Sequence, residues 1–167
     1  MPASPAEDAF HAFVVARTPA LSRTAYLLTG DAHLAEDLVQ AALFKAARAW
    51  DRIEDSPEAY VRRILYTQNV SWWRSRRHVR ETALASYDAP SATPDTDLRL
   101  TLEQALARLT TRQRTVLVLR FFEDLTEVQV GDVLGIGSGT VKSITRQALG
   151  RLRTLTPELA ELIGEPS

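Results

Sequence analysis

The chain has 167 residues, with no cysteine and with 20 lysine and arginine residues against 21 aspartate and glutamate residues. This length suits one domain or two small ones, and the lack of cysteine excludes disulfides, thiolate zinc sites and a cysteine nucleophile. No apolar run reaches the roughly 18 residues that would span a bilayer, and residues 1–8 lack the basic and then apolar pattern of a signal peptide. We therefore expect a soluble cytoplasmic protein with no membrane insertion.

The first elements along the chain are predicted to be helices. Apolar residues at spacings of three and four predict a helix over residues 10–28, which Thr18-Pro19 should force to restart or kink because proline has no N–H to donate. Gly30 closes that helix, and the same spacing continues over residues 32–50. A third helix is predicted over residues 56–80, since a serine followed by proline and glutamate is typical of a helix start.

A stretch rich in proline, serine, threonine and aspartate, residues 84–97, predicts a linker. The segments on both sides show helical spacing, so the expected fold is all-α, with two helical domains joined by a flexible linker. The expected domains are residues 5–83 and 98–155. Residues 156–167 are expected to form a C-terminal tail, in which residues 157–163 would pack as a short apolar helix, with a site for a partner as the alternative.

Four helices are predicted in the second domain. The first two cover residues 98–109 and 110–122, and the last two form a helix-turn-helix around the turn Gly135-Ile136-Gly137. Thr126-Glu127-Val128-Gln129 fits a capping box at the start of the third helix, and Ser138 is expected to cap the fourth. The fourth helix would bury Val141, Ile144, Ala148, Leu149 and Leu152. Its outward face would carry Thr140, Lys142, Ser143, Arg146, Gln147 and Arg151.

That outward face suits DNA, because a major groove admits one helix and these side chains can contact base edges and phosphates. One alternative is a phosphate-binding loop, but such a loop needs glycine before its Lys-Ser pair, whereas Val141 precedes Lys142. A purely structural helical hairpin is the other alternative. The histidines His11, His33 and His78 lack ligand spacing, so we expect no metal and no cofactor.

Charge is segregated along the chain. Residues 59–80, 108–120 and 138–153 hold 14 of the 20 basic residues and no acidic residue. Residues 31–58 hold seven acidic residues against three basic ones. Solvated helix faces are the simpler explanation, but such surfaces usually mix both signs. The basic segments therefore favour a nucleic-acid partner, and the acidic segment favours a protein partner.

Two adjacent tryptophans, Trp72 and Trp73, stand beside a run of arginines in the predicted third helix. One indole is expected to face inward with Val61, Ile64 and Leu65, and the other to lie near the arginine side chains. The alternative is that both indoles lie in the core. An exposed aromatic ring among basic residues suits single-stranded or opened nucleic acid, on which bases stack.

Five stretches of the chain resemble, in this order, regions 2 and 4 of bacterial extracytoplasmic-function (group IV) sigma factors of the sigma-70 superfamily: residues 35–40, 55–65, 71–74, 106–125 and 139–143. The tryptophan pair and the stretch before residue 32 are similar to the SigE-type subgroup of actinobacteria. The resemblance implies a transcription initiation factor that binds core RNA polymerase and directs it to promoters through their −10 and −35 elements. We do not expect an enzyme, because no nucleophile–base pair or carboxylate pair stands out in the sequence.

The resemblance implies region 2 over residues 5–83 and region 4 over residues 98–155. Its partners would be the β′ clamp helices and β flap of core RNA polymerase, promoter DNA, and an anti-sigma factor where one regulates it. The residues implied for the −35 element are Ser138, Thr140, Lys142, Ser143, Arg146, Gln147 and Arg151. Those implied for the −10 element are Arg63, Thr67, Asn69, Ser71, Trp72, Trp73, Arg74, Arg76 and Arg77. Those implied for polymerase docking are Glu36, Asp37, Leu38 and Gln40.

The chain departs from the family at Thr67, where asparagine is usual, and at Ile144 and Arg146-Gln147 in the recognition helix. The −35 preference of relatives therefore does not transfer to it. The alternative function is a stand-alone helix-turn-helix regulator, in which the first domain senses a signal or forms dimers. A helical adaptor that binds no DNA is a third interpretation. The acidic helix over residues 31–51 discriminates among these, because a sigma factor needs it for polymerase binding.

Overall fold

The computed structural model describes the backbone of residues 1–80 and 98–157, and the side chains of residues 1–75 and 102–157. Every regular element in these ranges is a helix, which confirms the all-α prediction. The chain divides into two compact units, residues 1–75 and 76–167. The predicted linker and the predicted helix in the tail lie outside the described residues. No described helix has the length and apolar character that a membrane crossing requires.

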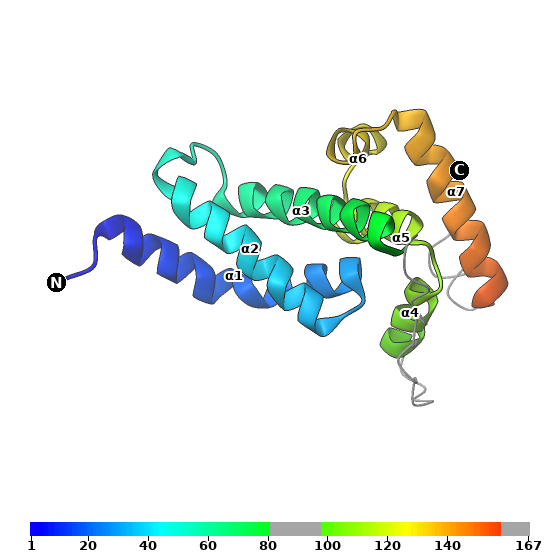
Figure 1. The fold of residues 1–167 in the computed structure, drawn as a ribbon, viewed down its shortest axis with the longest axis horizontal. Helices are drawn as coiled ribbons and strands as arrows, with labels where there is room; N and C mark the ends of the chain where they lie inside the picture. Colours follow the sequence, from blue (N-terminus) through cyan, green and yellow to red (C-terminus); the bar gives the residue numbers. More distant parts are fainter. Residues whose placement is uncertain (81–97, 158–167) are drawn as a thin grey trace. The chain divides into compact units, whose positions relative to one another are not determined.

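The first unit is built from three long helices and one short turn of 3₁₀ helix (Figure 1). Helix α1 covers Pro5–Thr29, α2 covers Ala32–Ala49, η1 covers Trp50–Arg52 and α3 covers Pro57–Arg80. A turn at Gly30, with a φ of 70°, reverses the chain so that α2 packs back along α1. Leucine and valine side chains from all three helices form a closed core: Leu21, Leu28, Leu38, Val61 and Leu65.

Local capping explains where these helices begin. The Ser4 hydroxyl accepts a hydrogen bond from the N–H of Glu7 at 3.2 Å, and the Glu7 carboxylate accepts one from the N–H of Ser4 at 2.8 Å. At the start of α2, the Asp31 carboxylate accepts from the N–H groups of His33 and Leu34. Each cap satisfies N–H groups that have no partner inside the helix.

Of the restart or kink predicted at Pro19, the restart does not occur, because α1 is one helix through that residue. Proline removes one hydrogen bond there, yet tertiary packing holds the N-terminal half of α1 in place. The rings of Phe10 and Phe13 lie 5.1 and 5.4 Å from the ring of Trp50 in η1. Aromatic contacts far from Pro19 in the sequence thus outweigh the local signal, and Pro19 itself is exposed to solvent.

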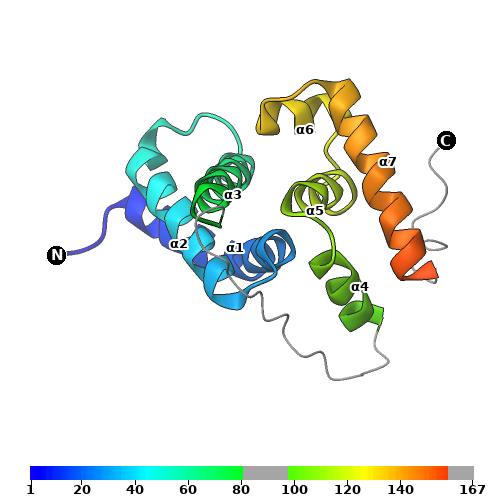
Figure 2. The same ribbon diagram turned by 45° about the vertical axis from the view of Figure 1, so that its right-hand side comes forward.

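Beyond the end of α3, the described part of the second unit contains five helical elements (Figure 2). These are α4 (Leu98–Ala107), α5 (Thr111–Leu117), η2 (Val118–Phe122), α6 (Glu127–Leu134) and α7 (Ser138–Leu155). Helix α7 packs against both α5 and α6. The sequence predicts a single helix over residues 110–122. In the structure its last five residues form a π-helical turn instead of continuing the α-helix.

The π turn at the end of α5 is held by contacts that the apolar spacing does not reveal. The N–H of Leu125 donates to the carbonyl of Leu119 at 2.9 Å, and that of Glu123 donates to the carbonyl of Val118 at 3.0 Å. The Arg120 guanidinium donates to the carbonyl of Leu125 at 2.6 Å. These bonds widen the last turn so that the chain can enter α6.

Helices α6 and α7 form the predicted helix-turn-helix. The capping box at Thr126 is confirmed, with Thr126 and Gln129 exchanging hydrogen bonds at 3.1 and 2.8 Å. Gly135 ends α6 with a φ of 71°, a conformation that residues with a Cβ rarely adopt. The prediction for Ser138 was wrong, because Gly137 occupies the cap position and Ser138 is already the first helical residue.

Candidate nucleic-acid interface

Helix α7 separates apolar from polar side chains as the sequence predicts. The five residues expected inside are all buried: Val141, Ile144, Ala148, Leu149 and Leu152. The seven residues expected at DNA are all exposed: Ser138, Thr140, Lys142, Ser143, Arg146, Gln147 and Arg151. The predicted orientation of the helix is therefore confirmed, and it presents one continuous polar surface.

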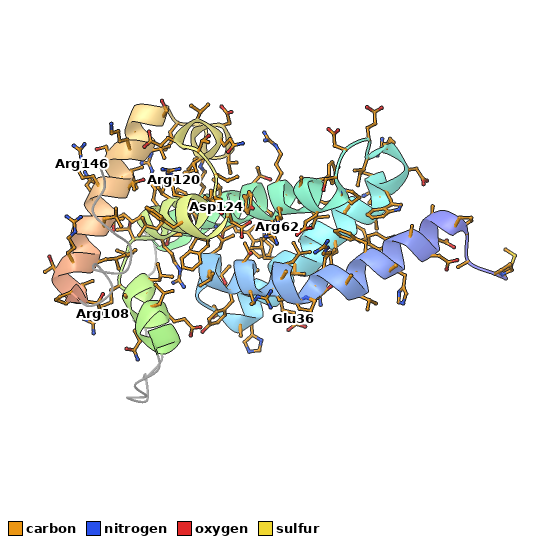
Figure 3. All side chains as sticks on the ribbon, turned by 180° about the vertical axis from the view of Figure 1, so that it is seen from behind. Glu36, Arg62, Arg108, Arg120, Asp124 and Arg146 are labelled. Carbon is orange, nitrogen blue, oxygen red and sulfur yellow. The ribbon has the colours of Figure 1, made fainter. Side chains whose placement is uncertain are left out.

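The long polar side chains on this surface are free for a partner. Within the described part of the chain, the side chains of Lys142, Arg146 and Gln147 make no hydrogen bond or ion pair. Figure 3 shows Arg146 on the outer side of α7, directed away from the ribbon. Uncommitted cationic and amide donors on an exposed helix are suited to phosphates and base edges.

Helix α3 carries all the residues predicted for the −10 element, and four of them share one face. Arg63, Thr67, Ser71 and Arg74 follow one another at spacings of four, four and three residues, and all are exposed. The Thr67 hydroxyl donates to the carbonyls of Arg63 and Ile64, so it is already engaged within the helix. The exposed face of α3 is therefore mainly basic and polar.

The remaining residues predicted for the −10 element lie in different environments. Trp72 and Trp73 are both half-buried, so neither is purely core or purely surface, and the Arg74 guanidinium lies 6.0 Å from the Trp73 ring. Asn69 is only 5% exposed and is engaged within the protein, so it offers no surface to DNA. Arg76 and Arg77 belong to α3, but their side chains lie outside the described residues.

Several arginines of the basic segments serve the fold instead of a partner surface. Arg62 donates to the Glu58 carboxylate at 3.1 and 3.2 Å and to the Thr24 hydroxyl at 3.1 Å. Arg17 pairs with the other oxygen of Glu58 at 3.4 Å, so the cluster joins α1 to α3. Arg114 is 7% exposed. Counting charges along the sequence therefore overstates the positive surface that DNA can meet.

We expect Arg62→Met to destabilise the fold by about 1–3 kcal/mol, because the ion pair with Glu58 within α3 and the hydrogen bond to Thr24 of α1 are lost while most of the apolar contact is kept. The side chains of Arg62 and Glu58 are 22% and 30% exposed, so solvent weakens the effect toward the low end. Urea unfolding measures it. Arg63→Met is the matched control on the next residue, which is exposed and should change stability by less than about 0.5 kcal/mol. Equal losses for both variants would contradict the role of the cluster.

Helix α2 presents three of the four residues predicted for docking. Glu36, Asp37 and Gln40 are exposed, and Figure 3 shows Glu36 directed away from the ribbon. Leu38 is 0% exposed, so it holds α2 against the core and cannot contact a partner. Sequence reasoning missed Phe44, which is 65% exposed and lies four residues after Gln40 on the same face. The spacing of four residues between Gln40 and Phe44 indicates a shared face and is visible in the sequence.

No group of three or more potential metal ligands occurs among the residues that the structure describes. The exposed surfaces on α2, α3 and α7 are instead helical faces with charged and amide side chains. Such faces are suited to macromolecular partners, and the acidic Glu36 and Asp37 in the first half of α2 contrast with the basic residues on the exposed faces of α3 and α7.

Both halves of the chain match known protein families. The family described as Sigma-70 region 2 matches residues 13–79, and that described as Sigma-70, region 4 matches residues 105–154. The RNA polymerase sigma-E factor of Streptomyces coelicolor is 36% identical over 148 residues, covering 86% of this chain and 84% of that protein. The ECF RNA polymerase sigma factor SigL of Mycobacterium tuberculosis is 30% identical, covering 83% and 84%.

A solved structure agrees with these relatives. The sigma factor RpoE of Bartonella quintana, in complex with the anti-sigma factor NepR, aligns with a TM-score of 0.69 and 27% identity over 89% of this chain and 97% of that one. The chain matches both region 2 and region 4, in that order, whereas a stand-alone helix-turn-helix regulator does not require region 2. The comparisons therefore favour the first of the functions weighed from the sequence.

Proposed function

This chain belongs to the extracytoplasmic-function sigma factors of the sigma-70 superfamily, and from that premise we propose which surfaces carry out each step. The protein is a transcription initiation factor that binds core RNA polymerase and directs it to promoter DNA. Its helix α7 reads the −35 element, α3 reads and opens the −10 element, and α2 docks on the polymerase. The observation that carries this assignment is the uncommitted polar face of α7 in a helix-turn-helix.

Helix α7 enters the major groove at the −35 element with its exposed face. A major groove about 12 Å wide accepts a single helix, and the buried side of α7 stays packed on α5 and α6. Lysine and arginine side chains neutralise phosphates and fix the register, while amide and guanidinium groups reach base edges. The contacting residues are Ser138, Thr140, Lys142, Ser143, Arg146, Gln147 and Arg151.

Helix α3 contacts the −10 element with the face that carries Arg63, Thr67, Ser71 and Arg74. The half-buried Trp73 ring lies 6.0 Å from the Arg74 guanidinium of this face, and a displaced base can stack there. Stacking is worth roughly 1–3 kcal/mol per base, which is comparable to the few kcal/mol needed to flip a base out of the duplex. Basic residues and aromatic rings on one helix thus supply the two contributions that strand opening requires.

Helix α2 docks on the β′ clamp helices through Glu36, Asp37 and Gln40, whose acidic character suits a basic partner. The second unit contacts the β flap.

Region 2 spans residues 5–83, the linker 84–97 and region 4 residues 98–155. The protein acts in the cytoplasm, as a regulatory and not a catalytic factor. An anti-sigma factor regulates it, as the Bartonella quintana complex suggests for a protein of the same fold.

Run-off transcription with core RNA polymerase tests the function as a whole. The full chain together with core enzyme should start transcripts at defined genomic promoters that core enzyme alone does not use. A chain that binds duplex DNA but never binds core enzyme would instead be a stand-alone regulator.

We expect Lys142→Ala to weaken promoter binding by the holoenzyme by about 1–3 kcal/mol if Lys142 touches a base. A pure phosphate contact would instead lower the slope of log affinity against log salt by about 1 and affect all promoters alike. A binding titration at several salt concentrations separates these outcomes. Arg23→Ala removes the same charge from an exposed position on α1 and is the control. A Lys142 variant that binds like this control would remove α7 from the −35 assignment.

A further inference from the structure

Arg146 occupies the middle of the exposed face of α7. Residues 139, 143, 146 and 150 lie within about 60° of one another around a helix of 3.6 residues per turn. Three of these are small, namely Gly139, Ser143 and Gly150, so Arg146 is the one long side chain among these four positions, and Arg153 follows it two turns further along the helix. Lys142 and Gln147 stand to either side of it. A partner that meets this face centrally therefore meets the Arg146 side chain first.

The two glycines among these positions are not required by the fold. A Cβ added at Gly139 or Gly150 would have no atom within 4 Å, and neither residue has a positive φ. Glycine is a poorer helix former than alanine in a helix interior, so Gly150 weakens α7 without an internal reason. Gly131 behaves differently, because a Cβ there would lie 2.6 Å from the carbonyl oxygen of Ile136. The bare backbone beside Arg146 instead permits close approach of a partner.

The Arg146 guanidinium is also free, in contrast to other arginines of the basic segments. Arg62 is held by Glu58 and Thr24, and Arg120 by the carbonyl of Leu125. Arg146 is exposed and makes no hydrogen bond or ion pair with any residue in the described ranges. Both edges of its planar fork thus remain available for a bidentate contact.

We propose that Arg146 is the side chain that specifies a guanine in the −35 element. The low surface at Gly139, Ser143 and Gly150 seats α7 deep enough for this side chain to reach the edge of a base. A guanidinium donates two parallel hydrogen bonds to the O6 and N7 acceptors of guanine, whereas adenine presents a donor in place of O6. This inference rests on the proposed role of α7 and adds the base that it selects.

The test is transcription by the full chain with core polymerase from a promoter library with a randomised −35 element. The wild-type protein should select G·C at one position, by about 5- to 150-fold over other pairs. Arg146→Ala should abolish the preference at that position alone. Arg146→Gln should shift it from guanine to adenine, because glutamine bonds the N6 and N7 groups of adenine. Arg153→Ala, on the same helix, is the matched control and should leave every base preference unchanged.

Two results would overturn the inference. Arg146→Ala lowering transcription equally across the library would make Arg146 a phosphate contact, and an unchanged preference for both variants would remove it from the interface. Circular dichroism and a pull-down on core polymerase accompany each variant, so that loss of folding or docking is recognised separately. Failure of the wild-type chain in the pull-down would reject the proposed function, which is distinct from failure of the base assignment.

Discussion

Asp37→Arg should weaken binding to core RNA polymerase by about 2–5 kcal/mol, which is roughly 30- to 5,000-fold in affinity. Asp37 is exposed on the outer face of α2, between Glu36 and Gln40. Its side chain forms no hydrogen bond or ion pair with another described residue, so its replacement removes no side-chain contact of this kind from the fold. A cation there would face the basic partner that the acidic face suits, and like charges held in contact are repelled.

A direct binding titration of the labelled full chain with core polymerase measures this loss. Asp8→Arg is the matched control, because it makes the same charge change at an exposed position in the first turn of α1. The control should bind within about threefold of the wild-type protein, and the thermal unfolding of the Asp37 variant should match that of the wild type. Normal binding by Asp37→Arg would place the docking surface elsewhere on the molecule.

The elements that the sequence predicts well are those governed by a single packed face or a local cap. Helix α7 packs against a single core. The apolar residues at spacings of three and four therefore predict correctly which of its side chains are buried. The Thr126 capping box and the Gly135 turn depend on residues within one turn of each other. For such features the information is local, and the three-dimensional structure adds little to what the sequence already predicts.

The sequence predicts poorly wherever a residue's environment depends on distant segments. Helix α1 is continuous through Pro19, and its N-terminal half packs on Trp50, some 30 residues further along the chain. Leu38 stands among predicted docking residues, yet the packing of α2 makes it part of the core. Periodicity indicates that a helix has an apolar face but does not measure how much of that face its neighbours cover.

The sequence also predicts poorly which positive charges are available to a partner. Arg62 and Arg120 belong to segments without acidic residues, and both are nonetheless committed to internal partners. Glu58 stands four residues before Arg62, just outside the segment, and that spacing is the local sign of their ion pair. The carbonyl that holds Arg120 leaves no sign in the sequence, because every residue has one. Only the structure separates these arginines from Arg146.

The turn of the helix-turn-helix folds back onto Gly131, a buried residue in the middle of α6. The Gly131 carbonyl accepts hydrogen bonds from the N–H groups of both Gly135 and Ile136, the latter at 3.0 Å. This arrangement brings the carbonyl oxygen of Ile136 to 2.6 Å from the place where a Cβ of residue 131 would lie. The obstacle is backbone, so a larger residue at 131 must displace the turn itself.

Gly131→Ala should therefore destabilise the second unit by about 1–3 kcal/mol, even after the gain in helix propensity of up to about 1 kcal/mol. The displaced turn also shifts the start of α7, so −35 binding should fall together with stability. Thermal unfolding followed by circular dichroism and a promoter-binding titration measure the two effects. Gly150→Ala is the matched control, because nothing lies within 4 Å of the added methyl, and it should raise stability by about 0.5–1 kcal/mol. Opposite signs for these two identical substitutions are expected because only Gly131 is in contact with the turn, and a stabilised Gly131 variant would contradict that geometry.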